Sequence, residues 1–187
     1  TALESLEKTD GQISGATLRD METDTVFPVR ARCVINATGP WVDSVRRMDD
    51  PRVRDCLRTT KGVHIIVPRD RIEHQHAVLL HSPRDQRVLF IIPWGEQHTI
   101  IGTTDTDFNG SPDAVSADED DFAYLLEAAN WHYPQAQLAR TDILGSYAGL
   151  RPLVADEESD DPSSVSREEE ILESPSGLIT LAGGKLT

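Results

Sequence analysis

The sequence has 187 residues, 38% of them hydrophobic, and a formal net charge of −14 at pH 7. That charge argues against a nucleic-acid partner, because the phosphates would be repelled. No stretch approaches the roughly 18 consecutive apolar residues that predict a membrane-spanning helix. The two cysteines, Cys33 and Cys56, are too few for a disulfide framework, so we expect a reducing, cytoplasmic compartment.

The first part of the chain predicts a β-meander that runs into a strand, a glycine turn and a helix. Glycines and a polar stretch divide residues 11–39 into short strands, the last of which stops at Gly39. Pro40 then suits the first turn of a helix. One side of that helix carries the apolar residues Trp41, Val42 and Val45.

The middle of the chain predicts an antiparallel sheet and one long helix. Short polar loops favour antiparallel pairing of the apolar strands at residues 61–68, 76–82, 87–94 and 98–104. The helix spans residues 116–134, with Ser116 as its cap and Glu119 three residues later. Its apolar stripe consists of Phe122, Leu125, Leu126 and Ala129, and Pro134 ends it.

The last part of the chain adds a strand over residues 142–154 and a hairpin over residues 166–184. The predicted fold class is therefore α+β, with an antiparallel or mixed β-sheet, flanking helices, and pieces of a different layer at both ends. Because the pattern begins in mid-element at Thr1, we expect the chain to be a segment of a longer protein.

Two glycine turns are candidates for binding a ligand through the backbone. In "NATGPW" (36–41) a strand ends in small residues, which lets backbone N–H groups approach a ligand, and the following helix N-terminus favours anions. The alternative is an ordinary turn between a strand and a helix. Gly183 and Gly184 stand before Lys185 in "GGKLT", for which the alternative is a plain β-turn.

Two charged or titratable side chains stand out within the predicted sheet. Arg151 lies between apolar residues in "GLRPL", and its planar fork suits a carboxylate or a phosphate. The alternative for Arg151 is a structural ion pair with a nearby acid. The second side chain is His64 in "KGVHIIVP", for which the alternative is a purely structural histidine. Asp105 and Asp107 are expected to cap a turn rather than bind calcium. No histidine–cysteine set predicts zinc, so no metal is expected.

Six stretches in this order carry a resemblance to a known family. They are "VINATGPWVD", "KGVHIIVP", "LFIIPW", "IIGTTDTD", "YAGLRPL" and "GGKLT". Together they resemble the FAD-dependent, quinone-linked aerobic glycerol-3-phosphate dehydrogenases, over roughly residues 11–187. The resemblance implies that a hydride passes from C2 of sn-glycerol 3-phosphate to FAD, which gives dihydroxyacetone phosphate, and that a quinone then accepts the electrons.

The resemblance also implies a division into domains. Residues 1–59 would belong to a FAD-binding domain of the glutathione-reductase type and residues 60–180 to a substrate-binding domain. Residues 181–187 would return to the FAD-binding domain. The implied cofactor-binding residues are Ala37, Thr38, Gly39, Trp41, Gly183, Gly184, Lys185, Leu186 and Thr187.

Substrate-binding and catalytic roles follow from the same resemblance. Arg151, Arg167 and Lys185 match basic groups that can bind the substrate phosphate. Arg151 and His64 match catalytic positions, with His64 the candidate for proton transfer. The family also implies peripheral association of the full-length enzyme with the inner face of the cytoplasmic membrane.

One part of the family's pattern does not occur in this sequence: the G-x-G-x-x-G turn that would hold the FAD pyrophosphate. We therefore expect residues 1–187 alone to bind FAD weakly or not at all and to be inactive. Two alternatives remain open. One is another oxidase of the D-amino-acid or 2-hydroxy-acid oxidase superfamily, whose arginine binds a carboxylate, and the other is a non-catalytic binding module.

Overall fold

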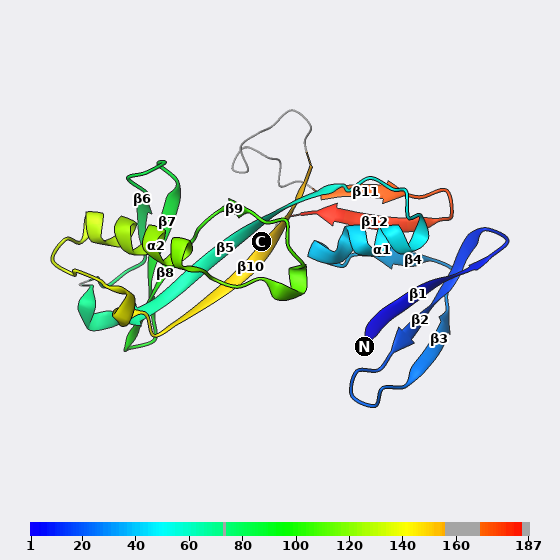
Figure 1. Cartoon of the computed structure of the whole chain (residues 1–187), viewed down its shortest axis with the longest axis horizontal. Helices are drawn as coiled ribbons and strands as arrows, with labels where there is room; N and C mark the ends of the chain where they lie inside the picture. Colours follow the sequence, from blue (N-terminus) through cyan, green and yellow to red (C-terminus); the bar gives the residue numbers. More distant parts are fainter. Residues whose placement is uncertain (73, 156–168, 185–187) are drawn as a thin grey trace. The chain divides into compact units, whose positions relative to one another are not determined.

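The computed structural model describes residues 1–72, 74–155 and 169–184. They form two compact units: the first unit joins Thr1–Thr59 with Pro152–Thr187, and the second unit is Thr60–Arg151. Strands β5 (Leu57–Pro68) and β10 (Gly145–Val154) each run across a boundary between the units. The fold class is α+β, as predicted, with antiparallel and mixed sheets (Figure 1).

The described part of the first unit contains two three-stranded sheets. The antiparallel sheet has the order β1 (Ala2–Thr9), β2 (Gln12–Arg19) and β3 (Val26–Arg30). The predicted meander over residues 11–39 is confirmed for β2 and β3 but not for its last strand, β4 (Val34–Asn36), which belongs to the second sheet. In the second sheet the predicted hairpin is also confirmed, and one of its strands pairs in parallel with β4. The order of that sheet is β11 (Glu169–Glu173), β12 (Leu178–Gly183) and β4 (Val34–Asn36).

One helix covers a face of this mixed sheet. The short 3₁₀ turn η1 (Gly39–Trp41) carries Pro40 near its start and leads into α1 (Val42–Asp49), as the sequence predicts. Val42 and Val45 are buried, whereas Trp41 is 40% exposed. Helix α1 packs against β12, whose Leu178 and Ala182 are buried.

The chain enters the first unit again at Pro152, because the two compact units divide between Arg151 and Pro152. The physical reason is the pairing of β12: it completes the mixed sheet on β4 and buries its apolar residues beside α1. The whole β11–β12 hairpin therefore belongs to the first unit.

The second unit is built on one antiparallel sheet, as the short loops predict. Its strands lie in the order β10-β5-β8-β7-β6, and β9 pairs with β5 beside this path. The other strands are β6 (Val78–His81), β7 (Val88–Trp94), β8 (His98–Gly102) and β9 (Thr106–Asp107). Short 3₁₀ turns lie at η2 (Arg69–Arg71), η3 (Pro112–Ala114) and η4 (Arg140–Asp142).

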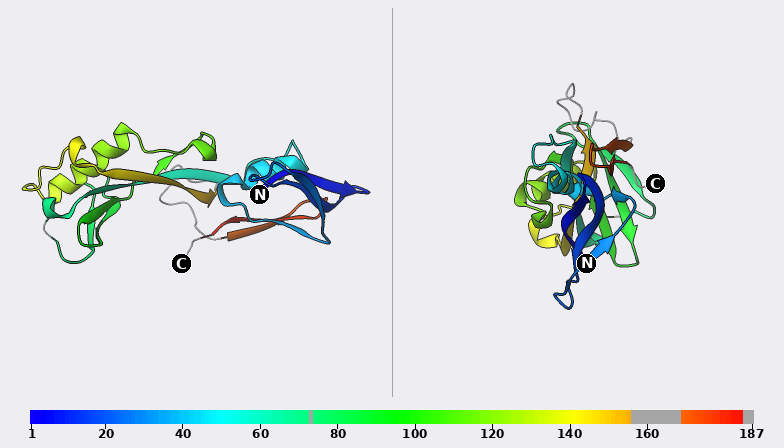
Figure 2. Two further views of the ribbon diagram at one scale, coloured as in Figure 1. Left: turned by 90° about the horizontal axis from the view of Figure 1, so that it is seen from below. Right: turned by 90° about the vertical axis from the view of Figure 1, so that its right-hand side faces the viewer.

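The core of the second unit lies between one face of this sheet and helix α2 (Glu119–His132), which lies on one side of the strands in the left view of Figure 2. Successive strand residues point to opposite faces, and the fully buried Val63, Ile65 and Val67 of β5 belong to the core cluster with Leu125 of α2. The intervening residues of β5, among them His64, therefore point to the opposite face of the sheet.

The start of α2 differs from the prediction. Asp118, not Ser116, is the N-cap. Its carboxylate accepts a hydrogen bond from the backbone N–H of Asp121, and the carboxylate of Asp121 accepts one from the backbone N–H of Asp118. Lys61 lies between these two carboxylates, with its Nζ 2.5 Å from Asp118 and 2.6 Å from Asp121. The buried ammonium of Lys61 therefore favours a cap made of carboxylates over a serine hydroxyl.

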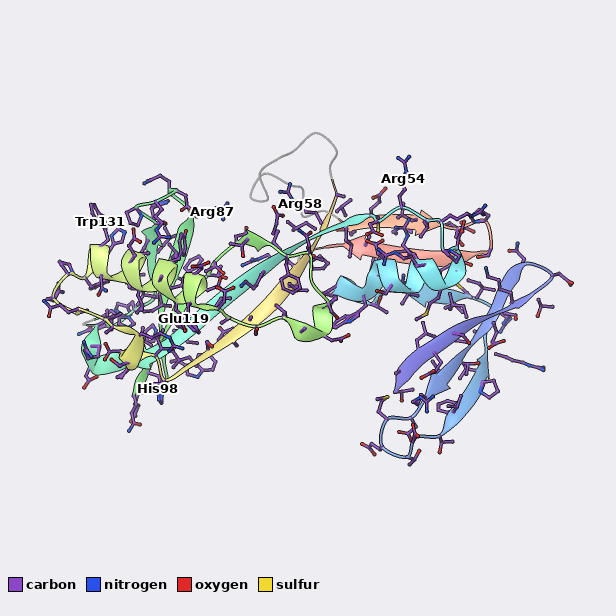
Figure 3. The ribbon with its side chains drawn as sticks, viewed as in Figure 1. Arg54, Arg58, Arg87, His98, Glu119 and Trp131 are labelled. Carbon is purple, nitrogen blue, oxygen red and sulfur yellow. The ribbon has the colours of Figure 1, made fainter. Side chains whose placement is uncertain are left out.

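Replacing Leu125 by Ala is expected to destabilise the protein by about 2–5 kcal/mol, because Leu125 is fully buried and its loss leaves a cavity. Urea unfolding followed by circular dichroism measures this change. The matched control is Trp131→Ala on the same helix, since Trp131 is 70% exposed (Figure 3). Equal losses in the two variants would contradict this packing of α2.

Candidate substrate and cofactor sites

Arg151 is held in place by acceptors that follow strand β8. Its guanidinium donates hydrogen bonds to the hydroxyl of Thr103 at 3.0 Å, to Oδ1 of Asp105 at 3.1 Å and to the carbonyl of Thr104 at 3.3 Å. The pair is partly exposed, with 27% of the Arg151 side chain and 14% of the Asp105 side chain accessible. Arg151 is thus a fixed cation on the surface of the second unit.

Asp105 is itself tethered, because Arg87 (labelled in Figure 3) donates a hydrogen bond to its backbone carbonyl. We expected Asp105 to cap a turn, and this expectation misses its main contact, which is the ion pair with Arg151. A carboxylate that follows one strand meets an arginine on a non-adjacent strand only when the sheet is formed. The spacing in "IGTTDTD" therefore gives no sign of it.

Gly62 makes room for the guanidinium. A Cβ atom at Gly62 would lie 2.5 Å from Nη2, 2.7 Å from Nη1 and 2.8 Å from Cζ of Arg151. A side chain at this position would displace the guanidinium, which rests directly on the backbone of β5. The glycine of "KGVHIIVP" has a steric function that its sequence position alone does not reveal.

His64 is enclosed between a glycine and an aromatic ring. Its ring stacks on that of Tyr147 with centroids 4.7 Å apart and an interplanar angle of 9°. On β8, Gly102 lies opposite His64, and a Cβ atom there would come within 2.2 Å of the imidazole Cδ2. Burial, and then the positive charge of Arg151, lower the pKa of His64 below its ordinary value. The imidazole is therefore neutral near pH 7 and can accept a proton.

The second unit therefore brings together both residues that the sequence singled out for catalysis. Arg151 and His64 lie close enough for the charge of Arg151 to act on the imidazole. Sequence reasoning missed their supports: Gly62, Thr103, Asp105 and Tyr147. This arrangement places a fixed cation, Arg151, which can bind an anion, next to a neutral base, His64.

A cavity of about 580 Å³ in the second unit is a poor anion site. It has three cationic residues in its lining, Lys61, Arg84 and Arg87, and each of them forms an ion pair with a carboxylate. The carboxylates outnumber them, because the lining includes Asp85, Asp105, Asp107, Asp118, Asp120 and Asp121. A phosphate would be repelled there, so Arg151 remains the better anchor for an anion.

In the first unit, two glycine turns meet at one edge of the mixed sheet. Strands β4 and β12 are parallel, with Asn36 opposite Thr180, so their carboxyl ends lie at the same edge. Gly39 after β4 and Gly183 and Gly184 at the end of β12 all have positive φ angles, of 58°, 73° and 89°. The carboxyl edge of parallel strands is where such sheets bind nucleotides.

The turn after β4 is fixed by side chains and leaves its backbone open. Asn36 is buried and donates a hydrogen bond to the carbonyl of Val42 at 2.9 Å, while Thr38 donates to Asn36 at 2.7 Å. Apart from its two chain neighbours, no described residue has an atom within 4 Å of a Cβ built on Gly39. Ala37, Thr38 and Trp41 surround this open turn, which fits close approach of a flat or anionic cofactor group.

Four predicted site residues lie outside the described residues: Arg167, Lys185, Leu186 and Thr187. The described ranges hold no group of three or more His, Cys, Asp or Glu side chains arranged to bind a metal ion. Within the same ranges, no helix has the length and apolar content that crossing a bilayer requires.

Comparisons with known proteins relate this chain to flavoproteins. The family described as "FAD dependent oxidoreductase" (DAO) matches residues 1–185. The chain is 42% identical over 176 residues to the "Aerobic glycerol-3-phosphate dehydrogenase" of Staphylococcus saprophyticus, covering 94% of this chain and 31% of that protein. It is also 42% identical over 187 residues to the mitochondrial glycerol-3-phosphate dehydrogenase of Macaca fascicularis, covering 97% and 26%. The chain thus spans less than a third of the length of these two relatives.

Solved structures agree with this relationship. The glycerol-3-phosphate dehydrogenase from Bacillus halodurans, complexed with FAD, superposes with a TM-score of 0.86 at 37% identity, covering 99% of this chain and 35% of that one. The iminodiacetate oxidase from Chelativorans shares the fold, with a TM-score of 0.60 at 17% identity over 96% of this chain and 42% of that one. Because the family match extends over nearly its whole length, the chain belongs to the FAD dependent oxidoreductase family.

Proposed function

We propose that this chain is part of an FAD-dependent enzyme that oxidises sn-glycerol 3-phosphate to dihydroxyacetone phosphate. The observation that carries the proposal is the guanidinium of Arg151, fixed by Thr103 and Asp105 beside a neutral imidazole. The relatives named glycerol-3-phosphate dehydrogenase supply the class of reaction, and Arg151 supplies a contact for the phosphate of that substrate.

In the second unit, the proposed roles follow from charge and protonation. Arg151 binds a phosphate oxygen through the accessible part of its guanidinium, with Gly62 behind it. His64 accepts the proton of the C2 hydroxyl as the alcohol becomes a ketone, and its lowered pKa keeps it in the basic form near neutral pH. Arg167 and Lys185 are proposed as further phosphate contacts.

In the first unit, the carboxyl edge of β4 and β12 is proposed as one side of the FAD site. The open backbone at Gly39 and the positive φ angles of Gly183 and Gly184 support this role. Ala37, Thr38 and Trp41, with Lys185, Leu186 and Thr187, complete the proposed set of contacts. When bound, FAD supplies the hydride acceptor.

We further propose that residues 1–59 serve the FAD-binding domain and that the second unit serves the substrate-binding domain. This assignment accords with the separate positions of the two candidate sites, since the glycine edge belongs to the first unit and Arg151 with His64 to the second. These boundaries are those of the compact units, and the return to the FAD-binding domain at residues 181–187 stays a prediction.

We also propose an electron acceptor and a cellular location for the full-length protein. A quinone takes the electrons from the reduced enzyme, and the full-length protein associates peripherally with the cytoplasmic face of the membrane. Comparing turnover with a short-chain quinone and with oxygen tests the first statement. Sedimentation of the full-length protein with lipid vesicles tests the second.

A substrate panel tests the proposed reaction against its rivals. We expect the full-length protein to oxidise glycerol 3-phosphate and to leave glycine, D- and L-amino acids and 2-hydroxyglutarate unchanged. Preference for an amino acid or a 2-hydroxy acid would instead make Arg151 a carboxylate anchor. No oxidation of any of these compounds, with a bound partner protein retained, would favour the non-catalytic binding module.

A further inference from the structure

Among the described residues, none forms a hydrogen bond with the imidazole of His64. Neither ring nitrogen of His64 has a hydrogen-bond partner among the residues that the structure describes. The rings of His74, His81 and His132 each have at least one such partner. A histidine that transfers protons is commonly held by a partner on one nitrogen, which fixes its tautomer and its direction. For His64 something else must set the direction of the ring.

Two ring contacts can do so. Gly102, the residue opposite on β8, has no side chain, and a Cβ there would lie 2.2, 2.6 and 2.8 Å from Cδ2, Cγ and Nε2. These three short distances place the glycine against the face of the ring rather than beyond its edge. Tyr147 on β10, the other neighbour of β5 in the sheet, stacks its ring on the imidazole.

We infer that Tyr147 is a positioning residue, whose stacked ring holds the imidazole of His64 over Gly102 and leaves its nitrogens for the substrate. The inference rests on the proposed function, because it assigns His64 to the hydroxyl proton of the substrate. An offset stack of parallel rings is worth a small but specific energy, and it restricts rotation about the bond that aims the ring. The hydroxyl of Tyr147 has no part in this role.

The surroundings of His64 support a role for the ring of Tyr147 rather than its hydroxyl. Burial raises the pKa of Tyr147, which keeps the phenol neutral and unsuited to accept a proton. The groups that face His64 are Tyr147 and Arg151 on β10, with Asp105 behind Arg151, while β7 brings the apolar Phe90 opposite Gly102. Arg151 is thus the permanent charge that acts on the imidazole, whatever residue replaces Tyr147.

The test compares Tyr147→Phe with Tyr147→Leu in the full-length, FAD-loaded protein. Both variants should fold, because Tyr147 is 49% exposed and lies outside the buried core. We expect Tyr147→Phe to match the wild type. Tyr147→Leu should lower kcat for glycerol 3-phosphate with little change in KM, and it should move the acidic limb of the pH profile toward the ordinary histidine pKa, about 6.5.

A second readout does not depend on turnover. In NMR spectra of histidine-labelled protein, assigned with His64→Gln, stacking shifts the ring proton resonances of His64, and this shift should persist in Tyr147→Phe and vanish in Tyr147→Leu. If the shift behaves so but glycerol 3-phosphate is not oxidised, the proposed function fails and the stack stands. Loss of activity in Tyr147→Phe, or wild-type kcat in Tyr147→Leu, overturns the inference.

Discussion

Replacing Arg151 by Ala is expected to lower kcat/KM for glycerol 3-phosphate by about 100- to 1,000-fold, the loss that follows removal of one preorganised charge-stabilising donor. The reason is that Arg151 is the fixed cation of the candidate substrate site, held by Thr103 and Asp105. Steady-state kinetics of the full-length protein measures the change. Arg151→Lys should recover only part of the activity, because an ammonium keeps the charge but not the planar fork.

Glycerol serves as the control substrate for this variant, because it has the reacting alcohol but no phosphate. Any slow oxidation of glycerol should be nearly equal in wild type and Arg151→Ala, since the lost contact is to the phosphate. Arg52→Ala is the control variant: it removes the same charge from a side chain that is 90% exposed. An equal fall in activity toward both substrates would make Arg151 a structural partner of Asp105 instead.

Replacing Gly62 by Ala is expected to weaken glycerol 3-phosphate binding by up to about 100-fold while leaving the fold intact, because small misplacements of a binding group have large effects. The new Cβ would collide with the guanidinium of Arg151, at 2.5 to 2.8 Å. The end of a flexible side chain can move aside, so the free energy of unfolding should change little. Substrate KM and urea unfolding, measured together, test both halves of the prediction.

Gly149→Ala is the matched control, because it places the same methyl group on β10, two residues from Arg151. In the described part of the chain, no atom beyond the two chain neighbours lies within 4 Å of a Cβ built on Gly149, so neither KM nor stability should change. If Gly62→Ala binds substrate as well as Gly149→Ala does, the guanidinium does not need its position on β5. Arg151 would then not be the phosphate anchor.

The elements of this fold were largely predictable, because they depend on local patterns. Apolar strands separated by short polar loops predicted the antiparallel sheet of the second unit, and the hairpin at residues 166–184 was found where expected. The predicted N-cap of α2, Ser116, was wrong by two residues, because the observed cap is Asp118. Its choice depends on Lys61, which is far away in the sequence and becomes a neighbour only through β5.

The candidate site was predictable only in its conspicuous members. Arg151 stands out as a guanidinium among apolar residues, and His64 as the single histidine of its strand. Their supports do not stand out, because the Asp105 ion pair and the Tyr147 stack depend on which strands become neighbours in the sheet. The parallel pairing of β12 with β4 has no local signal for the same reason, because the two strands are far apart in the sequence.

In the proposed reaction, Arg151 anchors the phosphate of the substrate that this flavoprotein oxidises. The most direct measurement is the anaerobic bleaching of the flavin absorption after full-length protein is mixed with glycerol 3-phosphate. We expect rapid bleaching in the wild type, with one dihydroxyacetone phosphate formed per flavin, and a much higher substrate concentration for half-maximal bleaching in Arg151→Ala. A flavin that stays oxidised with glycerol 3-phosphate but bleaches with an amino acid would contradict the claim.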